Sequence, residues 1–422
     1  MELTNVQPAP REPIRVLFVS HDTGMWGAQR TLLTLLSAID RRICSPLLAV
    51  PYEGPMCSVA SELGIPVFVE KIVHWVPGWS VSSRRQRFAY LCRFFKTLGS
   101  RCRAIERLIS DQGVDLVYTN TVTCVEGAIA ARCTGKPHVW HIHEHILGNS
   151  ELAPLLPYRL YCAAVGLLSR SIIFCSKTLA IDYPWLSRKA SVIYNGLPLP
   201  PLCDRIAARA KATNAFGIDA GTKLVAVIGA LQPRKDHLTF LAAAEQVARR
   251  VEEVLFLIVG AGSESYTNLL RQRIRDQRLD SRVKLLGWRD DIHDLMAAID
   301  VLVISSEQES FGLTAIEALA METPVVATRC GGPEEIIEDG VTGFLVPVKD
   351  PRAMTDAIVR LLLDPKLASC LGKSGRKHVV EQFGVQRYVQ GIQGIIQETA
   401  SFRNHNDILE LRERPGKHQL EM

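Results

Sequence analysis

The sequence lacks the features that would place it in several large classes of protein. None of its eleven cysteines is part of a Cys-x-x-Cys pair, so neither zinc ligation nor a disulfide framework is predicted, and reduced thiols are expected. The net charge of +5 over 422 residues is too small to favour nucleic acid as a partner. The longest apolar stretch, 160–175, is interrupted by Arg170 and is too short for a membrane span. The N-terminus has no basic n-region, so no signal peptide is expected and the predicted location is the cytoplasm.

Short apolar runs alternate with helix-period segments along the chain, which predicts parallel sheets with crossover helices. A proline-rich segment at 198–201 separates two series of such runs. The expected strands are 14–19, 46–50, 67–69, 116–118, 139–142, 171–175 and 191–194, then 224–228, 254–259, 283–286, 301–304, 324–327 and 343–346. Two doubly wound domains of α/β class, facing each other across a cleft, account for both series.

Two glutamates, Glu309 and Glu317, follow the apolar run 301–304. Glu309 is expected in a loop at the end of that strand, and Glu317 in the next helix among small and apolar neighbours, where a carboxylate is costly without a partner. The helix N-terminus between them offers free N–H groups and a positive dipole end, which favour a phosphate. The bare spacing also suits a solvated helix face, but its context favours a nucleotide-sugar site.

The region 283–347 resembles the donor-binding half of the retaining glycosyltransferases of sequence family 4, which have the GT-B fold. The matching segments are Leu286-Gly287-Trp288, 298–301, 309–317, 324–328, Gly331-Gly332-Pro333-Glu334-Glu335 and 340–346. The resemblance implies two facing Rossmann-like domains: an acceptor-binding domain over 1–200 and a nucleotide-sugar-binding domain over 201–384. It also implies a C-terminal crossover helix over 385–401, followed here by a polar tail over 402–422.

The resemblance also assigns roles within the site. It implies that Glu309 binds hydroxyl groups of the donor sugar and that Glu317 holds the ribose hydroxyls of a nucleoside-diphosphate sugar. The backbone of Ser310, Phe311, Gly312 and Leu313 is expected to meet sugar and phosphate. Neither a metal nor another cofactor is expected, because GT-B enzymes generally need none.

A basic turn, Arg234-Lys235, follows the first strand of the second series. There it would neutralise a diphosphate, although a solvated basic turn stays an open alternative. Many relatives carry an arginine directly after the glycine that precedes this turn. This chain has Ala230 instead, so the usual two-point cationic clamp is in doubt and Arg234 is the candidate substitute.

Weaker signals come from glycines and one tryptophan. Gly260 and Gly262 form a strand-end Gly-x-Gly, which is more often a tight turn but in the family shapes the nucleotide pocket. Trp288 would lie beside the base, and packing explains it equally well. Gly27 belongs to a loop that is similar to the first-domain loop approaching the donor phosphates, and a plain strand-to-helix turn is its alternative.

Four histidines, at positions 138, 141, 143 and 145, raise the question of a metal. No second cluster at zinc-site spacing accompanies them, so zinc is not expected. His143, at the expected strand end, resembles the catalytic-cleft histidine of the family, whose role would be contact with the transferred sugar. His141 is expected to pack inside the strand.

The segment 82–109 contains eight basic residues and one acid, Glu106, with four aromatic residues interleaved. The basic residues are Arg84, Arg85, Arg87, Arg93, Lys96, Arg101, Arg103 and Arg107. This pattern predicts an amphipathic helix that docks on an anionic membrane surface, as a lipid-linked acceptor would require. Solvated arginines, or arginines that hold an anionic acceptor, stay open.

The predicted function is a metal-independent retaining transfer of a hexose-type sugar from a nucleoside-diphosphate sugar to a glycan or lipid-linked acceptor. Envelope polysaccharide or glycolipid synthesis, at the inner face of the cytoplasmic membrane, is the expected setting. Two alternatives remain: a non-catalytic nucleotide-sugar-binding scaffold, and a nucleotide-sugar hydrolase or epimerase on the same fold. A phosphorylase would need a lysine for pyridoxal phosphate, to which no feature of the sequence points.

Overall fold

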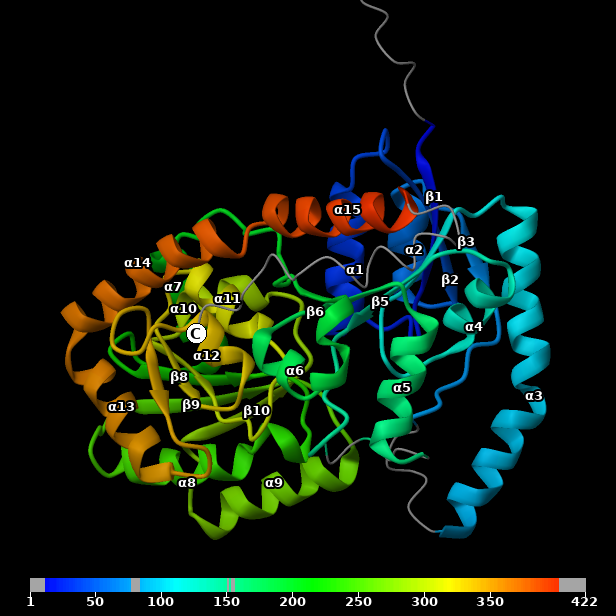
Figure 1. Ribbon diagram of the computed structural model, residues 1–422. Helices are drawn as coiled ribbons and strands as arrows, with labels where there is room; N and C mark the ends of the chain where they lie inside the picture. Colours follow the sequence, from blue (N-terminus) through cyan, green and yellow to red (C-terminus); the bar gives the residue numbers. More distant parts are fainter. Residues whose placement is uncertain (1–11, 77–83, 150–151, 153–155, 402–422) are drawn as a thin grey trace, which may run out of the picture.

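The computed structural model describes residues 12–76, 84–149, 152 and 156–401, which form two parallel sheets covered by helices (Figure 1). Each expected apolar run coincides with a strand, and the ends differ by at most two residues. The predicted α/β class with two doubly wound units is therefore confirmed. The predicted tail, 402–422, lies outside the described residues.

The first sheet has seven strands in the order β3-β2-β1-β4-β5-β6-β7. They are β1 (Ile14–Val19), β2 (Cys44–Val50), β3 (Val67–Val69), β4 (Leu116–Thr119), β5 (His138–Ile142), β6 (Ser171–Phe174) and β7 (Ala190–Val192). Val16 of β1 lies opposite Pro46 of β2 and Leu116 of β4. The strand order reverses between β1 and β4, so a crevice is expected at the carboxyl ends of these strands.

The second sheet has six strands in the order β10-β9-β8-β11-β12-β13. They are β8 (Lys223–Ile228), β9 (Val254–Val259), β10 (Val283–Gly287), β11 (Val301–Ile304), β12 (Val325–Thr328) and β13 (Phe344–Val346). Val225 of β8 lies opposite Phe256 of β9 and Val301 of β11, which places the reversal of this sheet between β8 and β11.

Helices cover both faces of the two sheets (Figure 1). The first unit contains α1 (Gly27–Ala38), α2 (Pro55–Glu62), α3 (Arg84–Asp111), α4 (Glu126–Cys133), α5 (Tyr158–Leu168), α6 (Lys177–Ile181) and the 3-10 helix η1 (Pro184–Lys189). The second contains α7 (Arg205–Phe216), the 3-10 helix η2 (Pro233–Lys235), α8 (His237–Ala248), α9 (Glu264–Asp276), α10 (Ile292–Ala298), α11 (Leu313–Ala320), α12 (Gly332–Ile336), α13 (Pro351–Leu363) and α14 (Pro365–Gln382). None of the helices within the described ranges is both long and apolar enough to cross a bilayer.

Hydrophobic patterning explains why these elements form. All six residues of β9 are apolar and buried, as is typical of a parallel strand that is covered on both faces. The last helix, α15 (Val385–Ser401), places Tyr388, Ile392 and Ile396 at four-residue intervals on one buried face. That face packs on α1, so the predicted crossover helix is confirmed (Figure 1).

The chain passes between the two units twice, and the two passages lie side by side. Leu197 and Gly384 form a parallel backbone bridge, in which the Leu197 N–H donates to the Phe383 carbonyl at 3.3 Å. Phe383 packs in turn with Tyr194 and Phe311. The domain boundaries expected at 200 and 384 stay predictions, and both lie next to this junction.

The basic segment 82–109 forms most of α3, and residues 82 and 83 lie outside the described residues. The prediction that Arg101 belongs to an exposed basic face is wrong, because its side chain is buried against α4. There its Nε donates to the equally buried Glu126 at 2.7 Å. This ion pair fixes α3 to the domain, whereas Phe88 and Phe95 are 70% and 53% exposed.

Candidate active site

A cavity of about 750 Å³ lies between the carboxyl ends of the two sheets. The loops after β1, β5 and β6 line it from the first unit, and those after β8, β9, β10 and β11 from the second. The predicted site residues that line it are Gly27, His143, Arg234, Lys235, Gly260, Trp288, Glu309, Ser310, Phe311, Gly312, Leu313 and Glu317. Gly262 is absent from the lining. The structure therefore brings these residues, which were expected from separate segments, around one cavity.

Glu309 is at the centre of a charged cluster. Its carboxylate accepts from the Ser306 hydroxyl at 2.8 Å and from the Lys235 ammonium, and the Arg234 guanidinium lies 3.7 Å away. The cluster forms because β8 and β11 are neighbours, so the loops at their carboxyl ends meet. The Ser305 hydroxyl donates to the Lys235 carbonyl at 2.8 Å and fixes the two loops together.

The protonation state of Glu309 follows from these contacts. Burial acts to raise the pKa of this carboxyl, but Lys235 and Arg234 outweigh it and lower the pKa from 4.5 to about 2. Glu309 is therefore ionised at neutral pH. In the ligand-free site it balances both cations of the turn that were predicted to meet a diphosphate.

The loop from Glu309 to Gly312 leads directly into α11. Two backbone hydrogen bonds fix Glu309 in this loop. Its N–H donates to the Cys330 carbonyl and its carbonyl accepts from the Gly332 N–H, each at 2.8 Å. Gly312 caps α11 in a left-handed conformation with φ 107, which side chains rarely adopt, and it has no capping side chain. The first turn of α11 carries no acid, and Leu313 and Thr314 at its start line the cavity.

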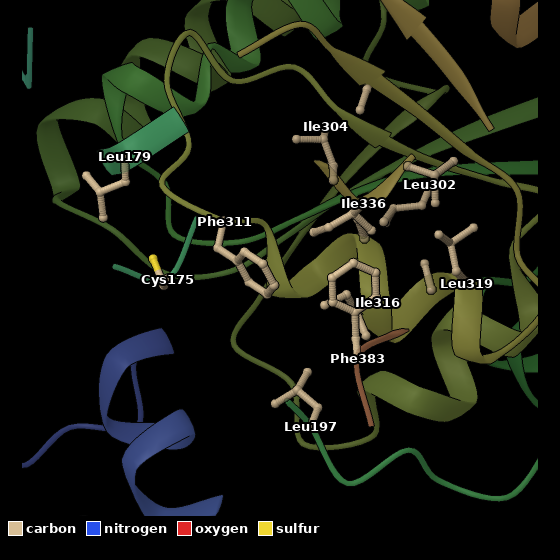
Figure 2. Close-up of a cluster of buried hydrophobic side chains, with 14 of the residues drawn as sticks. Cys175, Leu179, Leu197, Leu302, Ile304, Phe311, Ile316, Leu319, Ile336 and Phe383 are labelled. Carbon is tan, nitrogen blue, oxygen red and sulfur yellow. The ribbon is translucent and has the colours of Figure 1, made fainter. Parts of the chain in front are cut away.

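Phe311 supports this loop from behind. Its side chain lies in a buried cluster with Ile316, Ile336 and Phe383 (Figure 2). The ring is 4% exposed, so it is packing that holds the backbone of this loop against the cavity. The predicted backbone role for Phe311 is compatible with this arrangement.

Glu317 has the partner that its burial requires, and the partner comes from the other unit. The Arg30 guanidinium, in the first turn of α1, donates to Oε1 of Glu317. The Glu317 side chain is 8% exposed and that of Arg30 is 38% exposed. Gly27, one turn earlier in α1, also approaches α11, since a Cβ there would lie 3.5 Å from the Leu313 side chain.

His143 follows β5 and faces the cavity from the first unit. Asn120 donates through Nδ2 to the Ala28 carbonyl at 2.9 Å, and its Oδ1 lies 3.0 Å from His143 Nε2. Because that oxygen can only accept, the imidazole carries its proton on Nε2. Burial, together with nearby His21, lowers the pKa of His143 to about 3. The ring is therefore neutral at physiological pH, with Nδ1 as an acceptor.

The other predicted histidines have separate protein partners. His141 is fully buried in β5 with Nδ1 at 2.7 Å from the Tyr118 hydroxyl, so the prediction that it packs inside the strand is confirmed. His138 pairs with the Thr119 hydroxyl and His145 with Asp182. Within the described ranges, no group of three or more His, Cys, Asp or Glu side chains is arranged to hold a metal ion. All eleven cysteines lie in those ranges and are free thiols.

The two glycines after β9 allow loops to approach each other. A Cβ on Gly260 would meet the Gly229 carbonyl oxygen at 1.8 Å, and one on Gly262 would meet the Leu231 carbonyl oxygen at 2.1 Å. Gly262 forms a backbone bridge with Leu231, so in this structure its place is in packing and not on the cavity wall. Ala230 lines the cavity, as does Trp288, which is 59% exposed and donates to Asp290 at 3.0 Å.

Several lining residues carried no predicted role: Arg30, His21, Gln29, Asn195, Gln232 and His237. Each of the last five has one buried polar atom without a hydrogen-bond partner among the described residues. The sequence indicated that Glu317 needs a partner, and Arg30 lies three residues after Gly27, whose loop was expected to approach the donor phosphates. No pattern linked the two residues, because they are 287 positions apart.

The family comparison agrees with this geometry. Residues 222–364 match the family model described as Glycosyl transferases group 1. The chain is 28% identical over 305 residues to UDP-Gal:alpha-D-GlcNAc-diphosphoundecaprenol alpha-1,3-galactosyltransferase of Escherichia coli, covering 69% of this chain and 77% of that protein. It is 34% identical over 174 residues to N-acetyl-alpha-D-glucosaminyl L-malate synthase of Bacillus anthracis, covering 41% of this chain and 45% of that protein.

Solved structures share the fold. HepE of Anabaena, crystallised with UDP-glucose, superposes with a TM-score of 0.75 at 23% identity, covering 91% of this chain and all of that one. Sucrose-phosphate synthase of Thermosynechococcus elongatus gives a TM-score of 0.69 at 20% identity, covering 93% of this chain and all of that one. At this level of identity the superpositions establish a common architecture of two facing units.

Proposed function

We propose a specific reaction for this chain, which belongs to the group 1 glycosyltransferases of GT-B fold, enzymes that act on nucleoside-diphosphate sugars. It transfers a hexose-type sugar, with retention of the anomeric configuration, to a glycan or lipid-linked acceptor in envelope polysaccharide or glycolipid synthesis. The observation that carries the proposal is the meeting of Glu309, Lys235 and Arg234 at the N-terminus of α11, with Glu317 one turn into that helix.

The donor is proposed to lie along this line of groups. Its diphosphate binds at the N-terminus of α11 and to Lys235 and Arg234. These two cations then pair with the phosphate charge instead of with Glu309. Glu309 then accepts from hydroxyls of the donor sugar, and Glu317 from the ribose hydroxyls. His143 contacts the transferred sugar from the opposite wall. Arg234 has the role of the arginine that many relatives carry at the position of Ala230.

The proposed chemical step needs no protein nucleophile. The acceptor oxygen forms a bond to the anomeric carbon on the face from which the diphosphate departs, and the bond between that carbon and the phosphate oxygen breaks. The acceptor's proton moves to the departing diphosphate. Lys235, Arg234 and the helix N-terminus stabilise the charge that develops on the leaving group. No metal is required in this scheme.

The relatives support the substrate class. The E. coli relative is named for transfer from UDP-Gal to a diphosphoundecaprenol-linked sugar, and HepE was crystallised with UDP-glucose. We take the same kinds of donor and acceptor as the first candidates for this chain. The base and the sugar of its donor are left to the experiment.

A nucleotide panel tests the donor site. Thermal unfolding is measured with UDP, GDP, ADP and dTDP and with their sugar nucleotides, with and without EDTA. A stabilising shift with one base, unchanged by EDTA, is expected, and its size bounds the affinity. Absence of any shift on folded protein would refute the donor site. Product analysis with and without acceptor then distinguishes a transferase from a hydrolase or epimerase.

The exposed part of α3 is the proposed membrane-docking surface, consistent with a peripheral location on the inner face of the cytoplasmic membrane. Arg85, Arg87, Arg93 and Lys96 are exposed around Phe88 and Phe95. The protein is expected to float with phosphatidylglycerol vesicles at low salt and not to float with phosphatidylcholine vesicles. Exchanging Arg85 and Arg87 for glutamine should weaken flotation, whereas exchanging Arg271 and Arg273 on α9 should not. Failure of the wild type to float with the anionic vesicles would refute membrane docking by α3.

A further inference from the structure

The ion pair between Arg30 and Glu317 joins the two units inside the cavity. Both of its side chains line the cavity, and they come from α1 and α11. By contrast, Glu335 on α12 accepts from the N–H groups of Lys177 and Thr178 at 2.8 and 2.7 Å, outside the cavity lining. A ligand in the cavity can therefore act directly on the Arg30 contact but not on the Glu335 contact.

The pair leaves hydrogen-bonding capacity on the ligand side. Arg30 contacts Oε1 of Glu317, and Oε2 accepts from none of the described residues. A carboxylate offers about four lone-pair sites, so an oxygen held by a guanidinium still leaves acceptors for a diol. The two oxygens of Glu317 thus have different surroundings: one accepts from a cation, and the other has no hydrogen-bond donor among the described residues.

We propose that Arg30 is a positioning residue of the nucleotide site. From the opposite unit it fixes the Glu317 carboxylate in the orientation in which the second oxygen accepts from the ribose hydroxyls. The affinity for the nucleotide therefore depends on the contact between the two units, although Glu317 itself belongs to only one of them. This inference rests on the proposed function, in which Glu317 binds the ribose.

Geometry explains why the positioning has to come from the other unit. Glu317 is surrounded within α11 by Ala315, Ile316 and Ala318, which offer no donor. The close approach of Gly27 to Leu313 brings the first turn of α1 within reach. That turn carries no acid that would compete for Arg30. Without the guanidinium, Glu317 would lose the contact that selects its orientation.

The test is isothermal titration of wild type and variants with the nucleoside diphosphate that the panel identifies. Arg30→Ala is expected to raise the dissociation constant about tenfold, the lower range for a charged hydrogen bond because Arg30 is part-exposed. Arg30→Lys, which keeps the charge, should recover part of the loss. Glu317→Gln should weaken binding similarly, and Arg30→Ala combined with Glu317→Gln should be little worse than either single variant, because the two residues act as a unit.

Glu335→Ala is the matched control. It removes contacts between the same two units but touches no residue of the cavity lining, so the dissociation constant is expected to change by less than about twofold. Small-angle scattering with and without nucleotide gives a second readout. The wild type should become more compact on binding, and Arg30→Ala should show a smaller change.

The outcomes separate the two levels of the proposal. Binding by the wild type with an unchanged dissociation constant in Arg30→Ala overturns the inference alone. Full additivity of Arg30→Ala and Glu317→Gln, or an equal loss in Glu335→Ala, overturns it as well. A wild type that binds none of the nucleoside diphosphates overturns the proposed function and the inference with it.

Discussion

Replacing Lys235 with methionine tests the electrostatics of the site without any substrate. Methionine keeps much of the side-chain volume but removes the ammonium group that donates to Glu309. The carboxylate, with its side chain 10% exposed, then retains the Ser306 hydroxyl and the Arg234 guanidinium at 3.7 Å. The variant therefore measures how much of the stability of this cluster depends on one cation.

The magnitude follows from the pKa of Glu309, which Lys235 and Arg234 hold at about 2 instead of 4.5 in spite of burial. Because the folded-state pKa is the lower one, the stabilisation is present above pH 4.5 and is lost as the pH falls towards 2. At roughly 1.4 kcal/mol per pKa unit, the difference between 4.5 and about 2 corresponds to a net stabilisation of about 3.5 kcal/mol, after the opposing effect of burial. Lys235 is the closer and larger contributor, so Lys235→Met is expected to lower the free energy of unfolding at pH 7 by about 2 kcal/mol.

The assay is urea denaturation of the wild type and the variant at several pH values between 7 and 3. The difference should be constant from pH 7 to about pH 5 and should shrink below pH 4.5, where the Glu309 carboxyl of the unfolded chain takes up a proton while that of the folded wild type is still ionised. Lys349→Met is the control, because Lys349 pairs with Glu307 at 2.9 Å on the surface and should behave like the wild type at every pH. A Lys235→Met variant as stable as the wild type at pH 7, or a difference that does not change with pH, would refute the reasoning.

Three further predictions concern other parts of the molecule. Glu309→Ala should lower sugar transfer about a hundredfold by removing the acceptor for donor-sugar hydroxyls; near-wild-type turnover of a variant with unchanged circular dichroism would contradict the assignment. Arg101→Met leaves a buried carboxylate without its cation and should cost about 3–5 kcal/mol in urea denaturation; a loss below about 1 kcal/mol would show that the pair adds little. Gly332→Ala places a Cβ 2.1 Å from the Phe311 carbonyl oxygen and should abolish the nucleotide-induced thermal shift. Gly394→Ala places its Cβ where no atom lies within 4 Å and should preserve that shift. An intact shift in both variants would exclude strain at the loop around Phe311.

The strands could be predicted because parallel strands that are buried on both faces are continuous apolar runs. The site followed from the same pattern, since polar residues directly after such runs gather at one edge of a sheet. Glu309 and Lys235 were therefore expected together, although they are 74 positions apart. This part of the prediction depended on the order of apolar runs and polar loop residues along the chain.

The remaining contacts depended on how the two units meet, which no local pattern records. The need of Glu317 for a partner was visible, but its identity as Arg30 depends on α1 facing α11. Arg101 shared the helical period of the exposed arginines, and only the position of Glu126 on α4 separates it from them. Gly262 was assigned to the pocket because glycine spacing does not distinguish contact with a ligand from contact with a neighbouring loop.

The packing of Phe311 has a mechanical consequence. Its backbone forms part of the cavity wall, and its ring stacks on Tyr194 and contacts Phe383, the residues that border the two passages of the chain between the units. Figure 2 shows Phe311 and Phe383 in one buried cluster. A ligand that shifts this wall is therefore expected to move the junction at Leu197 and Gly384 through the ring of Phe311. Occupancy of the site and the angle between the two units are then expected to be coupled through this aromatic contact.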